Sequence, residues 1–146
     1  MIRKATRNDV RAVVEIVTAA YAPLTARMDK PPAPMLDDYP ARIAEGVVDV
    51  WDDGGVVLGM IILVDLDDAL MLENVAVSPN AQGRGVGRDL VAYAEAQARS
   101  RGHKRICLYT HVTMTENQRM YAQLGYAETS RGEDEGYHRV QFEKHL

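Results

Sequence analysis

Three glycines, Gly83, Gly85 and Gly87, alternate with other residues past the middle of the chain. They follow the apolar stretch 70–77 and precede a segment whose apolar residues recur at helical spacing. A glycine-rich loop that opens a helix presents several backbone N–H groups to one point, which makes a binding site for an anion. Because glycine has no Cβ, a bulky ligand can approach the main chain closely. The segment therefore predicts binding of a phosphate or pyrophosphate group.

The spacing of these glycines excludes two common phosphate-binding loops. A P-loop requires a Lys-Ser or Lys-Thr pair after its second glycine, whereas Arg88 and Asp89 follow Gly87. A dinucleotide-binding fingerprint has two residues between its second and third glycines, whereas one residue separates Gly85 from Gly87. An ordinary strand-to-helix turn without a ligand is the alternative interpretation.

Two motifs in this order resemble those of the GNAT acyltransferases. Residues 82–87, Gln-Gly-Arg-Gly-Val-Gly, match the Gln/Arg-x-x-Gly-x-Gly/Ala motif of that family. Further along, Asn117, Tyr121, Gly125 and Tyr126 match its Asn-x-x-x-Tyr-x-x-x-Gly-Phe/Tyr element. The resemblance covers residues 47–143 well, and the residues before them only in general layout.

The resemblance implies acetyl-CoA as the acyl donor and no metal ion. In the family the glycine loop holds the pyrophosphate, and the preceding strand pairs with the pantetheine amides as a neighbouring strand would. The residues thereby assigned to the donor are Val75, Ala76, Val77, Gln82, Gly83, Arg84, Gly85, Val86, Gly87, Arg88, Asn117 and Tyr121. Arg84 and Arg88 are also compatible with solvated surface arginines, and Asn117 with a residue that caps its helix.

The resemblance assigns catalysis to Tyr121 and Glu73. In the family the matching tyrosine protonates the leaving thiolate, and a phenol with an ordinary pKa of about 10 suits this role. Glu73 lies in an apolar strand and shares a face with Met71, Val75 and Val77, where a carboxylate is unfavourable without a partner or a purpose. We therefore expect it to act as the base or to orient a water relay. The alternatives are a core tyrosine and a glutamate paired at a solvent-lined face.

Composition predicts one folded domain, residues 1–146, with 47% hydrophobic residues. The net charge of −4 argues against nucleic-acid binding, and no apolar run is long enough to cross a membrane. The single cysteine, Cys107, is expected to be a buried apolar side chain, and the four histidines show no metal-ligand spacing. These features indicate a cytoplasmic protein without a resident metal.

The expected fold is α/β with a mixed sheet, in the order β-α-α-β-β-β-α-β-α-β-β. The expected strands are 2–5, 47–51, 56–64, 70–77, 105–110, 126–131 and 137–143. Two of the expected helices are 35–45 and the segment that follows the glycine loop to about residue 101. The apolar stripe of the first helix is expected at Val10, Val13, Val14, Val17 and Ala20, and that of the helix after the loop at Val86, Leu90, Val91, Ala94 and Ala98. The resemblance further implies that the fourth and fifth strands run parallel and splay apart.

These features together predict an acetyl-CoA-dependent N-acetyltransferase, in which a primary amine attacks the donor directly within a ternary complex. The alternative from another class is a non-catalytic acyl-CoA-binding or sensor domain. The acceptor amine, a small molecule or a protein amine, is left open by the sequence. The acyl-chain preference and the oligomeric state, with a homodimer as one option, are also left open.

Overall fold

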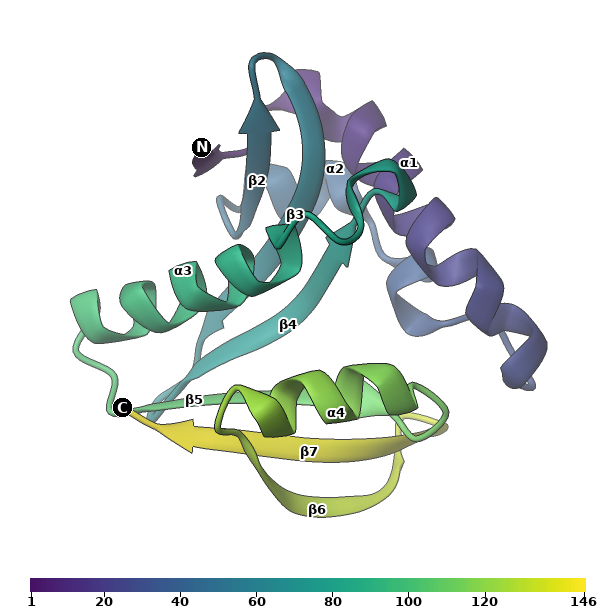
Figure 1. Ribbon diagram of the computed structural model, residues 1–146, viewed down its shortest axis with the longest axis vertical. Helices are drawn as coiled ribbons and strands as arrows, with labels where there is room; N and C mark the ends of the chain where they lie inside the picture. Colours follow the sequence, from purple (N-terminus) through teal and green to yellow (C-terminus); the bar gives the residue numbers. More distant parts are fainter. The chain divides into compact units, whose positions relative to one another are not determined.

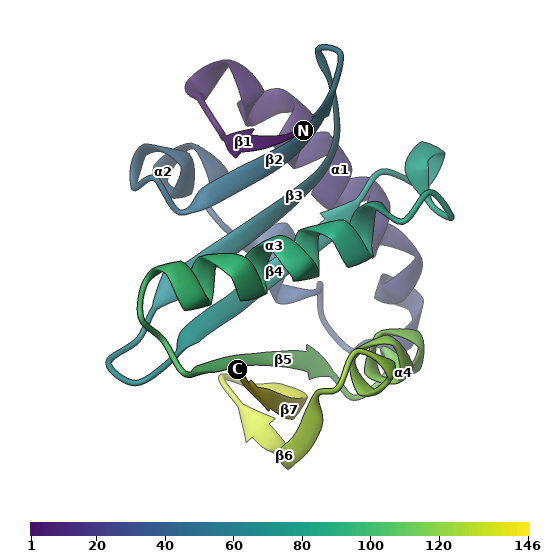
Figure 2. The same ribbon diagram turned by 60° about the vertical axis from the view of Figure 1, so that its left-hand side comes forward.

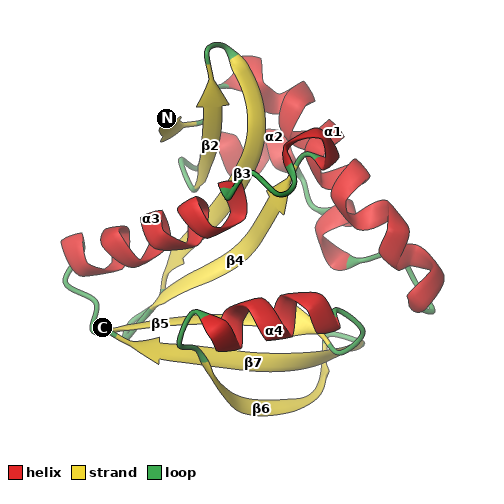
Figure 3. Cartoon of the chain, viewed as in Figure 1, coloured by secondary structure: helices red, strands yellow, loops and turns green.

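A computed structural model describes all residues, 1–146, and confirms the expected order of elements (Figure 1, Figure 3). The strands are β1 (Ile2–Lys4), β2 (Val48–Asp53), β3 (Val56–Asp65), β4 (Leu70–Val77), β5 (Arg105–His111), β6 (Ala127–Asp134) and β7 (Tyr137–His145). The α-helices are α1 (Val10–Tyr21), α2 (Tyr39–Ala44), α3 (Val86–Ser100) and α4 (Thr115–Gln123). Short 3-10 turns are η1 (Arg7–Asp9), η2 (Ala22–Arg27), η3 (Ala33–Leu36) and η4 (Pro79–Ala81).

The strands form one mixed sheet in the order β1-β2-β3-β4-β5-β7-β6. The pairs β1–β2, β2–β3, β5–β7 and β6–β7 are antiparallel. The pair β4–β5 is parallel, as expected, with Leu70, Met71 and Leu72 opposite Ile106, Cys107 and Leu108. The predicted splaying of these two strands stays a prediction.

The chain forms two compact units, which we describe separately. Unit 1 comprises Met1–Leu63 and Asn74–Ala94, and unit 2 comprises Val64–Glu73 and Glu95–Leu146. In unit 1, α1 and α2 cover one face of β2 and β3, and the first half of α3 lies on the opposite face (Figure 2). In unit 2, α4 lies along β5 and β7 (Figure 3). The single-domain boundary 1–146 stays a prediction.

The apolar stripe of α3 is confirmed, but that of α1 needs one correction. All five expected residues of α3 are at most 1% exposed. On α1, Val14 is 39% exposed, and Ile16 takes its place in the core beside Val13 and Val17. The 3-10 turn η1 leads directly into α1, without a break in the chain between Asp9 and Val10.

The second helix is shorter than expected, because the chain between residues 35 and 39 first makes a separate 3-10 turn. Helix α2 begins at Tyr39, after Asp38 has accepted a hydrogen bond from the Ala41 N–H at 3.1 Å. Pro40 lies in the first turn of this helix, where its missing N–H has no consequence. The cap therefore starts the helix four residues later than the pattern of apolar residues indicated.

The last two strands are longer than predicted. The acidic segment 132–136 was expected to be a turn, but β6 continues through it to Asp134. Only Glu135 and Gly136 remain between the strands, with φ of 51° and 83°. Two consecutive positive φ angles are the geometry of a tight hairpin turn, which a glycine at the second position favours.

No helix of the structure combines the length and the apolar composition needed to cross a membrane.

The entry into α1 is held by Asp9. Its carboxylate accepts two hydrogen bonds from Arg3, at 2.8 and 3.0 Å, and one from the Thr6 N–H at 2.8 Å. These donors, led by Arg3, lower the pKa of Asp9 from 3.8 to about 2. Because the pKa is lower in the folded state, the stabilisation is complete above pH 3.8 and is lost as the pH falls toward 2.

We expect Asp9→Asn to lower the free energy of unfolding at pH 7 by about 2 kcal/mol, since a mostly buried charge-assisted pair is lost. At pH 2 the difference between variant and wild type should shrink, because about half of the Asp9 carboxylates are then protonated in the folded state. Urea denaturation at both pH values measures this. Glu15→Gln, which removes the exposed Arg11–Glu15 pair, is the control and should have almost no effect at either pH. A deficit that is the same at pH 2 and pH 7 would contradict the assignment.

Candidate functional site

The glycine loop has the backbone geometry of an open anion site. Gly83 and Gly85 have φ of 83° and 80°, which other residues adopt only with strain. A Cβ at either position would have no atom within 4 Å, so the space above the loop is open. The first backbone hydrogen bond of α3 runs from the Asp89 N–H to the Gly85 carbonyl. The N–H groups of residues 86–88 precede this bond and have no acceptor within the helix.

Gly87 differs from the other two glycines, and Gly59 has a role that the sequence did not indicate. Gly87 lies inside α3, and a Cβ there would meet Val77 at an ordinary 3.6 Å. A Cβ at Gly59 would lie 2.9 Å from Val86 and 3.0 Å from Leu90. The first turn of α3 therefore packs against the backbone of β3, and Gly59 provides the room.

The two arginines near the loop have different surroundings. Arg84 pairs with Asp53 at 3.2 Å, and both side chains are about half exposed. Arg88 is exposed and makes no ion pair in the structure. Arg88, which lies among the first residues of α3, is therefore the better placed of the two to add charge to an anion at the helix N-terminus.

Strand β4 keeps strict alternation, as the sequence predicted. Met71, Glu73, Val75 and Val77 are half-buried, and the residues between them are buried. The alternation extends over the whole strand, so one face of β4 packs inward and the other is accessible. The accessible face carries the carboxylate of Glu73.

A buried hydrogen-bond network surrounds Asn74 of β4, directly before the residues 75–77 that the sequence predicts to bind the donor. Asn74 accepts a hydrogen bond from the Tyr21 hydroxyl at 2.8 Å and donates one to the Tyr39 oxygen at 3.2 Å. The Tyr39 hydroxyl in turn donates to the Pro34 carbonyl, and the Tyr21 hydroxyl also approaches the Val75 carbonyl at 3.4 Å. The network joins β4 to α1, α2 and η3. The sequence contained a signal for it, since Asn74 is a polar residue at an inward position of an apolar strand.

Glu73 belongs to an aromatic and charged cluster in unit 2. The carboxylate of Glu73 contributes to raising the pKa of Tyr109, although burial of that phenol is the larger cause. The guanidinium of Arg139 lies 4.1 Å from the centre of the Tyr109 ring and 5.5 Å from that of Tyr137. Arg139 is buried and pairs with Asp134 at 3.1 Å. The Tyr109 phenol therefore has both the carboxylate of Glu73 and the guanidinium of Arg139 in its neighbourhood.

The motif that contains Tyr121 has a physical explanation in the end of α4. The Tyr126 N–H donates to the Tyr121 carbonyl at 3.0 Å, and the Gly125 N–H donates to the Ala122 carbonyl at 3.1 Å. Gly125 has φ of 93°. This pair of bonds is a Schellman motif. In this motif the residue after the glycine, here Tyr126, commonly contacts the residue five positions before itself, here Tyr121. Here the Tyr121 and Tyr126 rings meet edge to face, with centroids 5.8 Å apart.

The side chain of Tyr121 is buried, with 3% exposed, and its ring also contacts Phe142 at 6.1 Å between centroids. Burial raises the pKa of Tyr121 well above its usual value, with no contribution from a charge or a hydrogen bond. A phenol at its ordinary pKa of about 10 is already protonated at neutral pH, and burial makes Tyr121 a weaker acid than an exposed phenol. The pKa of Tyr126 is raised as well, first by burial and then by the Glu95 carboxylate that accepts its hydrogen bond.

Asn117 lies one turn before Tyr121 and is half-buried. It is the third residue of α4, whose N-cap is Met114, without a side-chain cap. The alternative that Asn117 caps this helix is therefore wrong. Thr113 instead places its hydroxyl 2.8 Å from His111 Nδ1.

Two further residue types were assessed from the sequence. Cys107 is half-buried rather than buried, and burial raises the pKa of its thiol, which disfavours a thiolate nucleophile. His111 is the last residue of β5, and its pKa is lowered by burial and by the nearby His138 and Arg139. No group of three or more metal-ligating side chains is present.

The predicted residues thus fall into two groups, one in each unit. The loop residues 82–88 and the strand residues 75–77 lie together in unit 1, where Gly87 faces Val77. Asn117 and Tyr121 share α4 in unit 2, and Glu73 lies in the same unit beside Tyr109. Sequence reasoning missed Gly59, the Asn74 network and the contacts of Glu95 and Lys144, because each of these joins segments that are distant along the chain.

The sequence is similar to known acetyltransferases. The sequence profile described as "Acetyltransferase (GNAT) family" matches residues 11–126. Mouse N-alpha-acetyltransferase 80 is 41% identical over 64 residues, which are 44% of this chain and 19% of that protein. Mycothiol acetyltransferase from Cellulomonas flavigena is 41% identical over 56 residues, 38% of this chain and 16% of that protein. The chain thus spans less than a fifth of the length of these relatives.

The fold is also that of solved structures. The PaiA N-acetyltransferase from Thermoplasma acidophilum, crystallised in complex with coenzyme A, superposes with a TM-score of 0.85 at 16% identity. The match covers 100% of this chain and 98% of that one.

We expect Gly85→Ala to weaken coenzyme A binding at least tenfold, about 1.4 kcal/mol. The added methyl group would project into the open space above the loop, and the residue would be strained at φ of 80° by about 1–2 kcal/mol. Gly46→Ala is the matched control, because Gly46 has φ of 78° and the same open surroundings in the same unit. Calorimetric titration should show a loss of affinity only in Gly85→Ala, while thermal melts should show similar destabilisation in both. Equal affinities for coenzyme A in the two variants would contradict its binding at this loop.

Proposed function

The chain belongs to the acetyltransferase (GNAT) family, and from this premise we propose that it transfers an acetyl group from acetyl-CoA to a primary amine. The observation that supports catalysis most directly is the placement of Tyr121, whose ring lies against the Tyr126 and Phe142 rings and whose carbonyl is held by the end of α4. A phenol is protonated at neutral pH even at its ordinary pKa of about 10, so Tyr121 has a proton to give to a departing thiolate.

The loop of unit 1 supports binding of the donor. Its two positive-φ glycines leave the backbone open, and the N–H groups of residues 86–88 lack helical acceptors. These features fit a pyrophosphate group, and Arg88 lies nearby to add positive charge. The backbone of residues 75–77 is the proposed partner of the pantetheine amides, with its first residue held by the Asn74 network.

Direct attack by the amine, in a ternary complex, is the mechanism that the side chains favour. A route through an acyl-enzyme needs an activated nucleophile, and burial instead raises the pKa of the single thiol, Cys107. The amine must then lose a proton, and Glu73 on the accessible face of β4 is the proposed base or the group that orients a water. In this proposal Glu73 accepts or directs the proton of the amine, and Tyr121 donates a proton to the thiolate.

We expect Tyr121→Phe to lower kcat by a factor of roughly 10²–10⁴, because the general acid is lost while the ring still packs against Tyr126 and Phe142. The affinity for coenzyme A should change little. In the wild-type protein, kcat should show no alkaline decline near pH 10, since burial moves the titration of Tyr121 above the ordinary phenol value of about 10. Near-normal kcat in a well-folded Phe variant would favour a non-catalytic acyl-CoA-binding domain instead.

We expect Glu73→Gln to lower kcat/KM for the amine about 100-fold, with unchanged affinity for coenzyme A, because the amide cannot accept a proton. The loss should be largest where the acceptor is still protonated, so the pH profile should shift to higher pH. Asp68→Asn, which removes an exposed carboxylate paired with Arg105 in the same unit, is the control and should retain activity. An unaltered pH profile in Glu73→Gln would contradict a role of Glu73 in proton transfer.

A further inference from the structure

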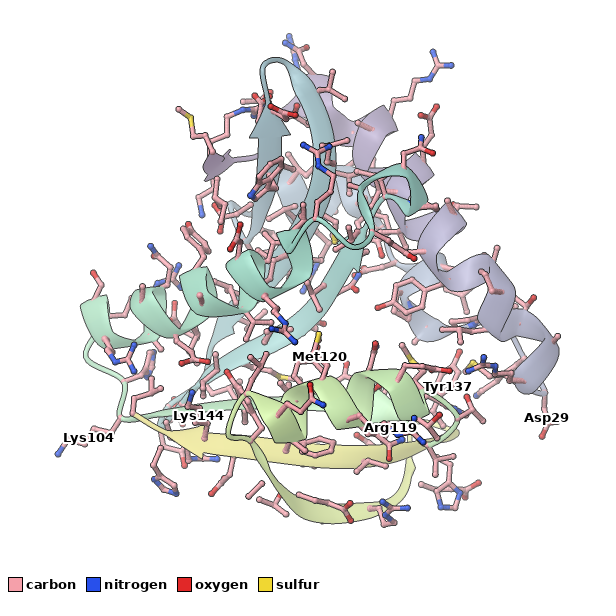
Figure 4. All side chains as sticks on the ribbon, in the orientation of Figure 1. Asp29, Lys104, Arg119, Met120, Tyr137 and Lys144 are labelled. Carbon is pink, nitrogen blue, oxygen red and sulfur yellow. The ribbon has the colours of Figure 1, made fainter.

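Three side chains from separate segments of unit 2 meet at the C-terminal end of α4. Lys144 of β7 places its Nζ 3.0 Å from Glu95 Oε1 and 2.9 Å from the Leu124 carbonyl oxygen. Glu95 of α3 accepts a second hydrogen bond, on Oε2, from the Tyr126 hydroxyl at 3.0 Å. Figure 4 shows Lys144 beside this end of α4. Arg119 and Met120, which belong to α4, are labelled in the same view. We call Glu95, Tyr126 and Lys144 the helix-end clamp.

The clamp is built from partly buried groups that complement one another. The side chains of Glu95 and Lys144 are 13% and 27% exposed, so their attraction is screened less than that of a surface pair. Both carboxylate oxygens of Glu95 have a donor, and Lys144 neutralises its charge. The ammonium group also lies at the negative end of α4, where a cation is favoured.

Gly125 lies beside the lysine side chain. A Cβ at Gly125 would lie 3.4 Å from Lys144 Cε, at the near limit of ordinary contact. The glycine is required by its φ of 93°, which closes the Schellman motif. The turn that presents the Leu124 carbonyl to Lys144 thus depends on this residue.

The clamp is linked to Tyr121 through Tyr126 and through Leu124, whose N–H donates to the Tyr121 carbonyl at 3.1 Å. The backbone of Tyr126 bonds the Tyr121 carbonyl, and its ring meets the Tyr121 ring edge to face. Glu95 fixes the far end of the Tyr126 ring through the hydroxyl, and Lys144 lies 5.6 Å from the centre of that ring. A movement of Glu95 or Lys144 would therefore be passed to the Tyr121 phenol.

We propose that Glu95 and Lys144 are positioning residues for catalysis, which hold the Tyr121 hydroxyl in line with its proton acceptor through Tyr126 and the end of α4. This inference rests on the proposed role of Tyr121 as the general acid. It adds that the acid is aligned by an ion pair that does not itself contact Tyr121. Small displacements of a catalytic group can lower a rate by orders of magnitude, so loss of the pair should affect turnover.

A double-mutant cycle between Lys144 and Tyr121 tests the proposal. Lys144→Met should lower kcat about tenfold in the wild-type background, with unchanged coenzyme A affinity. In the Tyr121→Phe background the same change should leave kcat unaltered, because the group that Lys144 aligns is already absent. Lys144→Arg keeps two donors and the charge, and it should restore most of the rate. All assays are run well below the melting temperature of each variant.

Two further variants separate alignment from folding. Tyr126→Phe keeps the edge-to-face ring contact but loses the bond to Glu95, so it should lower kcat with little loss of melting temperature. Arg101→Met is the matched control, since Arg101 pairs with Asp65 at the same 3.0 Å and is 29% exposed. It should lower stability as Lys144→Met does, or less, and leave kcat unchanged.

The outcomes distinguish this inference from the proposed function. If Lys144→Met lowers kcat equally in both backgrounds, the clamp does not act through Tyr121 and the proposal is overturned while the general acid stands. If Lys144→Met and Tyr126→Phe lower only the melting temperature, the clamp is structural and the proposal is again overturned. If Tyr121→Phe alone retains kcat, the general acid and the clamp both fail.

Discussion

The bond between the Tyr126 N–H and the Tyr121 carbonyl, at 3.0 Å, is the interaction on which the candidate catalytic half of the molecule depends. It closes α4, and it requires the left-handed backbone of Gly125. Closure brings the two tyrosine rings together and turns the chain into β6. One local backbone motif thus sets the position of the reactive phenol and the direction of the next strand.

The proposed site residues of the two units differ in their exposure to water. In unit 1 the glycine loop leaves backbone N–H groups without helical partners, and an anion can satisfy them at little conformational expense. In unit 2 the phenol of Tyr121 is withdrawn from water, which disfavours its anion and raises its pKa. The proposed binding groups are thus exposed donors, whereas the proposed proton donor is a buried phenol.

Family membership and the low identity to solved structures have a common explanation. The fold agrees with that of the PaiA N-acetyltransferase at 16% identity, because most positions need only an apolar side chain of suitable size on the inward face. Few positions demand one residue type. Gly85 and Gly125 are among them, since their positive φ angles exclude most alternatives.

The sequence alone determined the order of elements, the buried face of α3, the alternation of β4 and the residue types of both motifs, because these are local patterns of spacing. It did not determine the start of α2, where Asp38 caps the helix, or the core position of Ile16 in place of Val14. Only the tertiary structure showed that Gly59 makes room for α3, that Asn74 links two tyrosines, and that Lys144 reaches Glu95 across 49 positions of chain. Such contacts join segments that folding brings together, and their partners are chosen by distance and burial rather than by position in the sequence.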